Sequence, residues 1–391
     1  MSAEPQPDRL GALRDDVRSF VDEEVLPVED VALRADHRDV LAGLMSEAKA
    51  RGLWALGHPE ELGGGGLPFL DYVDVCEIVG RSAPAYVALG THSLQDVLML
   101  KRHGTREQQE RWLGPLVDGE VFTGMAMTEP EVAGSDPKTI RTTAHQDGDA
   151  WVINGHKWFT SWADRAAFVT VIAKSDPTAD LHRQFSAFLV PTDTEGFEVT
   201  RLLSVMGEDE TIHGELRFDG VRVSDAHLLG ERGQGFAIAQ HRLGPARIFD
   251  AMRWLGQAER AFELATATAR RRYAHGTTLA EKGEIRHLIA ESASQIYATR
   301  LIVLDAARAI DAGDDAHVRV SIAKFVGARM LNDVVDRAIQ VHGAAGLSSD
   351  LPLERMYREA RAARIIDGPD EVHRMVVARA LIEDTAANAP W

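Results

Sequence analysis

Cysteine is almost absent from this sequence: Cys76 is the single one among 391 residues. The chain therefore cannot form an internal disulfide or a metal site built on several cysteines. Cys76 lies in the apolar segment from Val73 to Val79, and a lone cysteine in such a segment is typically a small buried residue. We expect Cys76 in the core.

Long apolar runs and an excess of positive charge are also missing. No uninterrupted apolar run approaches the roughly 20 residues of a membrane helix, and the first residues, Met-Ser-Ala-Glu-Pro, do not resemble a signal peptide. The formal net charge of −17 argues against a general role in binding nucleic acid or anionic membranes, although an anionic small molecule could bind at a local basic cluster. These absences predict a cytoplasmic protein of enzyme size.

Familiar catalytic motifs are missing as well. HExxH and GxSxG do not occur, and His58-Pro-Glu60 matches only the first half of a zinc deaminase signature. The 15 histidines show no spacing typical of metal ligands, so we expect no metal site.

The periodicity of the apolar residues divides the chain into three parts. Residues 1–120 show helical spacing, as at Leu10, Leu13 and Val17, and Thr105 with Gln108 indicates a capping box. Residues 121–232 contain short strand-like segments separated by Gly, Pro and Asp. Residues 233–391 contain four helical segments, at 236–272, 284–311, 316–342 and 370–387. The sequence predicts an α+β protein with an N-terminal α-helical domain, a small β-barrel or sandwich domain, and a C-terminal four-helix bundle.

Two local signals refine this prediction. Asn154-Gly155 lies between the strand-like segments 151–153 and 157–160, which is typical of a tight hairpin. Pro245 follows Gly244 within the first C-terminal helix. Because proline removes a backbone donor, we expect a kink there.

The stretch from Ala363 to His373 contains the strongest candidate for a catalytic residue. Asp367 follows two apolar residues, Ile365 and Ile366, and precedes Gly368-Pro369. We expect the isoleucines to be buried and the Gly-Pro pair to bend the chain. The carboxylate would then project into an apolar pocket, as a base for a carbon-bound proton requires. A solvated turn is the alternative, because Asp, Gly and Pro are common in turns.

Four further segments could line a ligand-binding site. The loop 127–136 is rich in small and hydroxyl residues. Trp158 and Thr160 alternate in a strand, so they would share a face able to flank a flat aromatic ring. Residues 270–272 end a long helix with three arginines, and 340–346 end another with glycines that permit close approach. Each also has an ordinary interpretation, namely a plain loop, a core tryptophan beside a solvated threonine, a helix-end charge cluster and a helix C-cap.

Together these segments resemble the signatures of the acyl-CoA dehydrogenase family over essentially the whole chain. Met127-Thr-Glu-Pro130, followed by Gly134-Ser-Asp136, is similar to the first signature, with one extra residue before Gly134. The segment from Gln340 to Glu359 is similar to the second, with Ala344 where Gly or Ser is usual. The forms of residues 129–136 and 367–373 most resemble the branch of human acyl-CoA dehydrogenases ten and eleven, here without their fused kinase-like domain.

The resemblance implies FAD as the cofactor and specific contacts for it. Thr128 would bind the pyrimidine end of the flavin, Trp158 would pack near the ring, and Thr160 would face N5. The other cofactor-binding residues implied are Met125, Met127, Gly134, Ser135, Phe159, Pro369, Asp370 and Glu371, together with Arg272, Gln340, Gly343 and Ala344, which would reach the FAD of a neighbouring subunit. The implied substrate contacts are Ser135, Gly244, Arg247 and Gly368. The protein should then be a homodimer or homotetramer.

The resemblance also implies a reaction of fatty acid β-oxidation. An acyl-CoA or acyl-carrier thioester would become a trans-2-enoyl thioester, with an electron-transfer flavoprotein as acceptor. Asp367 stands where most of the family has Glu, and the stretch 243–247, which supplies the base in some relatives, has no carboxylate. Asp367 would therefore remove the α-proton while flavin N5 takes the β-hydride. A flavin oxidase or monooxygenase on the same fold, and a non-catalytic acyl-thioester binding protein, remain open, and the sequence does not define the acyl chain.

Overall fold

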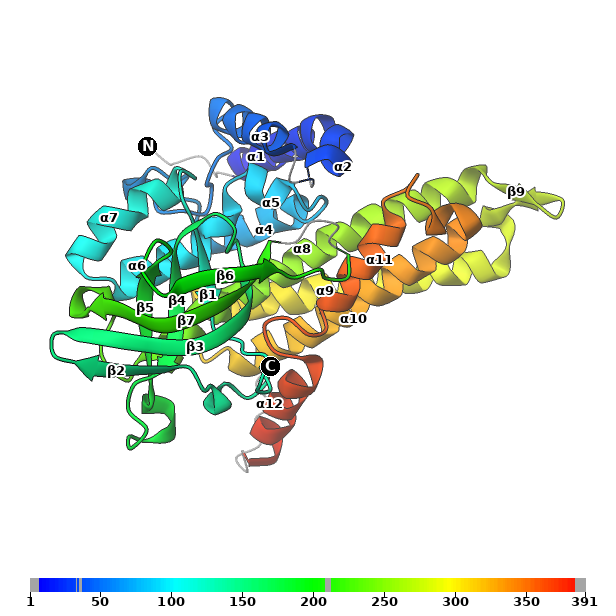
Figure 1. Ribbon diagram of the computed structural model, residues 1–391. Coiled ribbons are helices and arrows are strands. Elements are labelled where there is room, and N and C mark those ends of the chain that lie inside the picture. The colour runs from blue at the N-terminus through cyan, green and yellow to red at the C-terminus, as the bar shows by residue number, and fades with distance from the viewer. Residues whose placement is uncertain (1–6, 33, 35–36, 208–211, 384–391) are drawn as a thin grey trace, which may run out of the picture.

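Helices, a β-sheet and further helices follow one another along the chain (Figure 1). The computed structural model describes residues 7–32, 34, 37–207 and 212–383. The predicted capping box is confirmed at the start of the last N-terminal helix, where the Gln108 amide donates to the Thr105 hydroxyl at 3.3 Å and the Thr105 amide donates to the Gln108 side chain at 3.0 Å. The N-terminal helices are α1 (Pro7–Phe20), α2 (Glu29–Ala32), α3 (Arg38–Ala50), α4 (Phe69–Val79), α5 (Ala85–Ala88), α6 (Leu94–His103) and α7 (Arg106–Val117).

One eight-stranded sheet forms the middle of the chain. Its order is β6-β7-β3-β2-β4-β5-β8, and β1 pairs with β4. The strand β1 lies parallel to β4, and the loop that follows it is tied to β3 by a 3.0 Å bond from the Trp158 amide to the Thr128 carbonyl. The strands are β1 (Phe122–Ala126), β2 (Thr143–Asp147), β3 (Ala150–Ser161), β4 (Ala166–Lys174), β5 (Phe185–Pro191), β6 (Phe197–Leu202), β7 (His213–Ser224) and β8 (Leu228–Leu229).

The hairpin predicted at Asn154-Gly155 is wrong, because β3 runs straight through both residues. The pairing of β3 with β7 shifts register between Ile153 and Gly155, and the Asn154 side chain accepts a 2.8 Å hydrogen bond from the Gly220 amide. A Cβ atom on Gly155 would lie 2.2 Å from the Thr142 hydroxyl. The pair therefore forms a bulge at which neighbouring chain approaches closely, which is the other common reason for glycine in a strand.

The C-terminal part is helical, and four of its helices correspond to the predicted segments. They are α8 (Gly235–Arg271), α9 (Gly283–Asp311), α10 (His317–His342) and α12 (Asp370–Glu383). Pro245 lies within α8, which continues beyond it. A further helix, α11 (Leu353–Ala362), and a two-stranded ribbon of β9 (Tyr273–Ala274) and β10 (Thr277–Thr278) are additional to the prediction.

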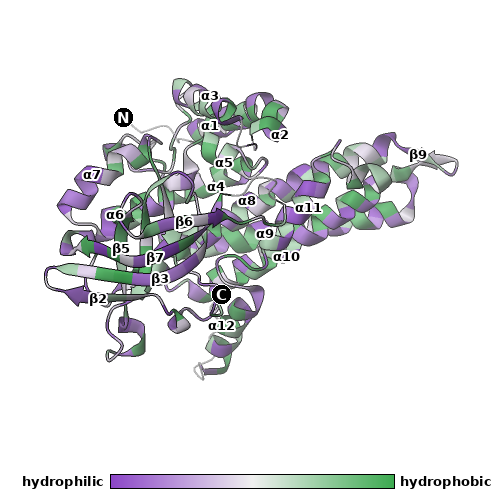
Figure 2. Cartoon of the chain, viewed as in Figure 1, coloured by the Kyte–Doolittle hydropathy of each residue, from purple (hydrophilic) through white to green (hydrophobic). Residues whose placement is uncertain are grey.

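The largest core joins the N-terminal and C-terminal helices. Phe20, Tyr72 and Phe249 are buried in one cluster that reaches from α1 to α11, and Figure 2 shows apolar segments along α4, α8 and α10, whereas α7 and β2 are more hydrophilic. Cys76 is buried here, as expected, and burial raises the pKa of its thiol to about 12. Such a thiol is an inert core group rather than a nucleophile.

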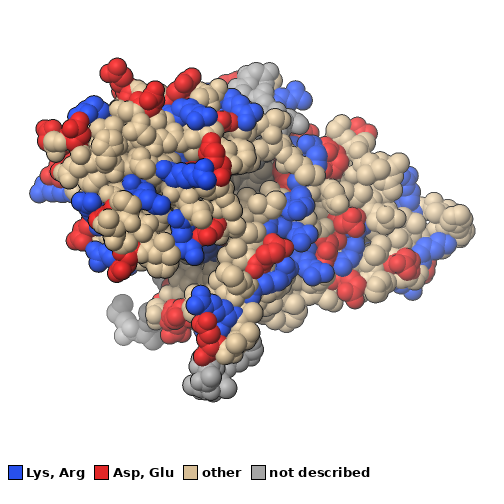
Figure 3. Space-filling model, turned by 60° about the horizontal axis from the view of Figure 1, so that its bottom comes forward, with Lys and Arg blue, Asp and Glu red and all other residues tan. Residues whose placement is uncertain are grey.

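The described residues contain neither a membrane-spanning helix nor a cluster of metal ligands. Among them, no helix combines the length and apolar character that a bilayer-spanning segment needs. Within the same ranges, no three His, Cys, Asp or Glu side chains are grouped so that they could hold a metal ion. On the face seen in Figure 3, acidic and basic side chains are interspersed.

Candidate active site

A cavity of about 2620 Å³ lies between the sheet, the N-terminal helices and the C-terminal helices. Figure 3 shows a hollow between the part that contains the sheet and the helical bundle. Segments far apart in the chain meet on the cavity wall. The predicted site residues found there are Met125, Met127, Thr128, Gly134, Ser135, Trp158, Phe159, Gly244, Arg247, Asp367, Gly368 and Pro369.

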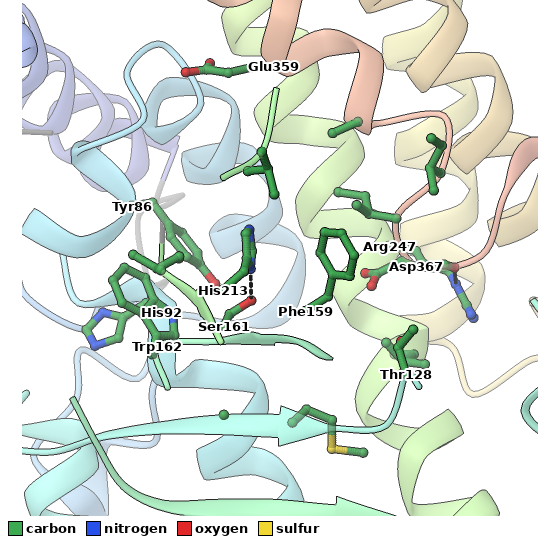
Figure 4. A pocket seen from close by; sticks show the side chains of 18 of the residues that line it. Tyr86, His92, Thr128, Phe159, Ser161, Trp162, His213, Arg247, Glu359 and Asp367 are labelled. Carbon is green, nitrogen blue, oxygen red and sulfur yellow. Dashed lines mark hydrogen bonds between the residues drawn. The ribbon is translucent and has the colours of Figure 1, made fainter. Parts of the chain in front are cut away.

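Asp367 lies in a tight turn whose carbonyl is held from two sides. Its φ is 53° and that of Gly368 is 99°, and a Cβ atom on Gly368 would lie 2.9 Å from His373 Nε2. The Arg247 guanidinium donates to the Asp367 carbonyl at 2.9 Å, and His373 Nε2 lies 3.1 Å from the same oxygen. In Figure 4 the Asp367 carboxylate points into the cavity, toward the ring of Phe159. The backbone is thus fixed while the carboxylate faces the cavity.

The prediction that Ile365 and Ile366 are buried is wrong. Their exposed fractions are 58% and 45%, and both line the cavity. After α11 the amides of both residues bond to the carbonyl of Ala362, and this turn directs the side chains toward the cavity rather than into the core. The apolar surface beside Asp367 therefore belongs to the wall that a ligand would cover.

Charged side chains of α8 surround the turn. Burial lowers the pKa of Arg247, and Asp367 opposes that shift. One turn earlier, Arg242 donates to both carboxylate oxygens of Asp96 at 2.8 and 3.0 Å, which joins α8 to α6. Although burial disfavours its charged form, Asp96 raises the pKa of Arg242 above its usual value. Both guanidiniums therefore remain charged beside the proposed base.

A buried ion pair fixes the loop after β1. The Lys157 ammonium, fully buried, lies 2.9 Å from the Glu129 carboxylate and donates to the Met127 carbonyl at 2.8 Å. The Glu129 carboxylate also accepts from the amides of Arg141 and Thr142 at 2.7 and 2.8 Å. Burial lowers the pKa of Lys157 to about 8, with Glu129 acting against the shift. This pair therefore anchors both ends of the loop 128–140.

Two polar groups beside this loop make no hydrogen bond to any described residue, namely Trp158 Nε1 and Thr160 Oγ1, and both are buried. Trp158 lines the cavity, whereas Thr160 is fully buried behind it. Between them Phe159 has a φ of 54°, so the strict alternation that predicts a shared face is interrupted here. Buried polar groups normally have partners. Two that lack them beside a large cavity fit the polar ring of a flavin.

Four predicted residues lie away from the cavity, at the far end of the bundle. Arg272 ends α8, Gln340 lies in the last turn of α10, and Gly343-Ala344 follow it. A 2.8 Å hydrogen bond between Thr268 and His342 joins the two helix ends. The four residues are exposed in the isolated chain, so a second molecule can reach this end.

Asp370 and Glu371 begin α12. The buried Asp370 carboxylate lies 3.3 Å from Lys324 Nζ and accepts from Arg364 Nε at 3.2 Å, whereas Glu371 is exposed. Asp370 therefore anchors α12 to α10, and Pro369 is the member of this group on the cavity wall.

Sequence reasoning missed several residues of the wall. Tyr86, His92, Asp96 and Arg242 line the cavity, and none of them belongs to the two signatures. Asp96 could have been found, because it directly precedes the apolar segment 97–100 and a carboxylate needs a charged partner when it is buried. For Tyr86 and His92 no comparable signal exists.

Three sequence profiles match consecutive parts of the chain. The N-terminal domain of acyl-CoA dehydrogenases matches residues 7–120, the middle domain residues 124–221 and the C-terminal domain residues 233–382. FadE2 of Mycobacterium tuberculosis, named as an acyl-CoA dehydrogenase, is 44% identical over 88% of this chain and 87% of its own length. Acyl-CoA dehydrogenase family member 10 of mouse is 41% identical over 92% of this chain, which spans only 36% of that longer protein.

The solved structures agree with the sequence matches. A Mycobacterium abscessus structure, described as that of an acyl-CoA dehydrogenase, matches with a TM-score of 0.91 at 38% identity, over 97% of this chain and 99% of that one. The same architecture is thus present over nearly the whole chain. The chain belongs to the acyl-CoA dehydrogenase family of FAD-dependent oxidoreductases.

Proposed function

We propose that this protein converts an acyl-CoA or acyl-carrier thioester to the trans-2-enoyl thioester, with Asp367 as the base that removes the α-proton. The observation that carries this proposal is the placement of Asp367, whose carboxylate faces the cavity from a backbone held by Arg247 and His373. FAD, when bound, supplies the acceptor for the β-hydride.

The chain's own contribution is to position the base. A free aspartate has a pKa of about 3.9 and is weak against a carbon acid, so geometry and surroundings must help it. The left-handed turn at Asp367 and Gly368 brings the backbone to the cavity wall, which suits a side chain one methylene shorter than glutamate. Ile365 and Ile366 would be covered by the bound acyl chain, and that contact would exclude water from the base.

The cofactor contacts belong to the same proposal. Thr128, Gly134 and Ser135 on the anchored loop, with Trp158 and Thr160 on β3, would hold the flavin. Arg272 and the segment 340–344 would contact the FAD of a neighbouring subunit, which makes a homodimer or homotetramer the working form. An electron-transfer flavoprotein is the proposed acceptor, and the cytoplasm is the proposed location.

The test compares Asp367→Asn with the unaltered holoenzyme. Each is mixed anaerobically with a set of acyl-CoA thioesters, and loss of the oxidised flavin absorbance is followed. We expect Asp367→Asn to retain FAD but to reduce it at least ~100-fold more slowly, since general base catalysis typically contributes ~10²–10⁴-fold. Asp314→Asn is the matched control, because Asp314 is an exposed carboxylate on the rim of the same cavity.

Other outcomes would favour other assignments. Full activity of Asp367→Asn would exclude Asp367 as the base. Rapid re-oxidation of the substrate-reduced flavin in air would favour a flavin oxidase. A purified protein that binds acyl-CoA but contains no flavin would favour a non-catalytic binding protein.

A further inference from the structure

The carbonyl oxygen of Asp367 is in contact with two helices, and one of these contacts continues into the bundle. Arg247 on α8 donates to this oxygen at 2.9 Å, and Nε2 of His373 on α12 lies 3.1 Å from it. The other ring nitrogen of His373, Nδ1, lies 3.2 Å from the hydroxyl of Ser321 on α10. A chain of hydrogen bonds therefore runs from α10 through the imidazole to the turn that carries the proposed base.

The partners of His373 determine which ring nitrogen carries the proton. Burial, with the nearby Arg247, lowers the pKa of His373 to about 4, so at neutral pH the ring is uncharged and has one donor and one acceptor nitrogen. A carbonyl oxygen only accepts hydrogen bonds, so Nε2 carries the proton and donates to Asp367. Nδ1 then accepts from the Ser321 hydroxyl. Ser321 therefore fixes the tautomer that the contact with Asp367 requires.

Ser321 and His373 are held in place by the packing of α10 against α12. Both residues are buried. Lys324, three residues after Ser321 on α10, lies 3.3 Å from the buried carboxylate of Asp370, which is three residues before His373 on α12. Because residues three apart lie on one side of a helix, the two contacts lie side by side. The ion pair fixes the start of α12 against α10, and the Ser321–His373 contact extends to the turn.

The turn depends on such contacts because its backbone conformation is unfavourable for the residue it carries. Asp367 has a φ of 53°, in the left-handed region where residues with a Cβ atom are strained, and such a conformation persists only where the surroundings define it. A Cβ atom on Gly368 would lie 2.9 Å from His373 Nε2, so the imidazole packs directly against the turn. Without the imidazole, the backbone after Asp367 would be freer to rotate, and the carboxylate would change its direction.

We propose that His373 is a positioning residue for the base and that Ser321 orients its ring. This inference rests on the proposed function. His373 acts through the Asp367 carbonyl rather than on the reacting atoms, and its hydrogen bond keeps the carboxylate directed into the cavity. Arg247 supplies the second bond to the same oxygen. Because a shift of about 1 Å in a catalytic group lowers a rate by up to ~100-fold, loss of the His373 bond should slow proton removal rather than weaken substrate binding.

The test uses two amides that each replace one nitrogen of the imidazole. The longer side chain of His373→Gln can donate to the Asp367 carbonyl in place of Nε2, whereas that of His373→Asn reaches only Ser321 in place of Nδ1. Each holoenzyme is mixed anaerobically with an acyl-CoA thioester that reduces the unaltered holoenzyme, and the rate at saturating substrate is expressed per bound flavin. We expect His373→Asn to be ~100-fold slower and His373→Gln to recover to within ~10-fold of the unaltered rate. The thioester concentration that gives half the maximal rate should change by less than ~3-fold in both variants.

Ser321→Ala is a smaller change that tests the same chain of hydrogen bonds. It removes one hydroxyl and leaves the imidazole and the ion pair between α10 and α12 in place. We expect flavin reduction to be ~5-fold slower per bound flavin, since the ring loses the hydrogen bond that orients it. The matched controls are His145→Asn, at an exposed site on β2, and Ser46→Ala, at an exposed site on α3. Both controls should reduce flavin at the unaltered rate.

The outcomes separate this inference from the proposal on which it rests. If Asp367→Asn is inactive while His373→Asn and Ser321→Ala keep the unaltered rate per bound flavin, the base is correct and the positioning role is wrong. Equally slow reduction in His373→Asn and His373→Gln would also overturn the positioning role, since the bond to the carbonyl would then have no effect. If His373→Asn does not fold or loses FAD, Ser321→Ala decides, and an unaltered rate in that variant contradicts the inference. If Asp367→Asn remains active, the proposed function itself is wrong.

Discussion

His92 is a neutral histidine in the cavity wall, and its environment has consequences for stability. Its ring stacks on Phe122 at 4.6 Å, and neither ring nitrogen has a partner among the described residues. Burial, with the nearby His58 and Arg165, lowers the pKa of His92 to about 3. When the pH falls, His92 of the unfolded chain therefore takes up a proton at a pH at which His92 of the folded chain is still neutral.

We expect His92→Phe to make the protein less sensitive to acid. Below a pH of about 6.5 the unfolded state binds a proton that folded His92 does not, so stability falls as pH falls, by up to ~1.4 kcal/mol per pH unit. Denaturant unfolding at several pH values between about 6.5 and 4 measures this slope. His145→Phe, at an exposed site on β2, is the matched control. If the pH dependence of stability is the same in His92→Phe as in the unaltered protein, the lowered pKa of His92 is wrong.

Single residues were predictable where the signal is local. Asp367 was found because the turn residues stand beside it in sequence. Arg242 was not, because its buried partner Asp96 lies in another part of the chain. The burial predicted for Ile365 and Ile366 failed for a related reason, since hydropathy does not distinguish a core residue from one on a cavity wall.

At the scale of elements, the loop after β1 depends on the pair of Glu129 and Lys157. We expect Glu129→Gln to lower the free energy of unfolding by ~3 kcal/mol, because it leaves a buried ammonium without its counter-charge. FAD should also be lost more easily, since the loop carries Thr128 and Ser135. Denaturant unfolding and the flavin-to-protein absorbance ratio measure these effects.

The matched control for that loop is Glu131→Gln. Glu131 lies on the same loop, but its side chain is 44% exposed and pairs with His156 at the surface. Such exposed pairs contribute about 0–1 kcal/mol, so we expect nearly normal stability and flavin content. Equal effects of the two variants would mean that the buried pair is not what holds the loop.

Element type was predictable from periodicity, whereas local geometry was not. The long C-terminal helices have sustained helical spacing and were placed nearly to their ends. Asn-Gly is a typical residue pair of hairpin turns. Asn154-Gly155 forms a bulge instead, because Thr142 and Gly220 approach it from neighbouring segments. The left-handed φ of Phe159 could not be predicted from the sequence, because the residue usually found at a positive φ is glycine.

For the whole molecule, the order of helical, β and helical parts was predictable, but the cavity was not. Its wall is assembled from residues between Asp30 and Val376, and composition or periodicity does not specify which side chains meet there. The family resemblance supplied only a minority of those residues. It did not supply Tyr86, His92 or the Asp96–Arg242 pair, which lie outside the two signatures.

The bundle also presents an apolar face that an oligomer would cover. Tyr297 and Leu301 are four residues apart on α9, so they lie on one side of the helix, and they are 65% and 50% exposed in the isolated chain. Large apolar side chains grouped on a surface typically mark an interface. A second subunit on this bundle is consistent with the proposal that Arg272 and the segment 340–344 contact a neighbour's FAD.

We therefore expect the double variant Tyr297→Asp and Leu301→Asp to dissociate into smaller species in sedimentation experiments. It should retain helical content while losing FAD, because each cofactor would lose the contacts of the neighbouring subunit. Leu181→Asp is the matched control, since Leu181 is 46% exposed but lies beyond the bundle, between β4 and β5. If the double variant keeps the mass of the oligomer but loses FAD, these residues affect the cofactor within one chain. If it keeps both, the α9 face is not the interface.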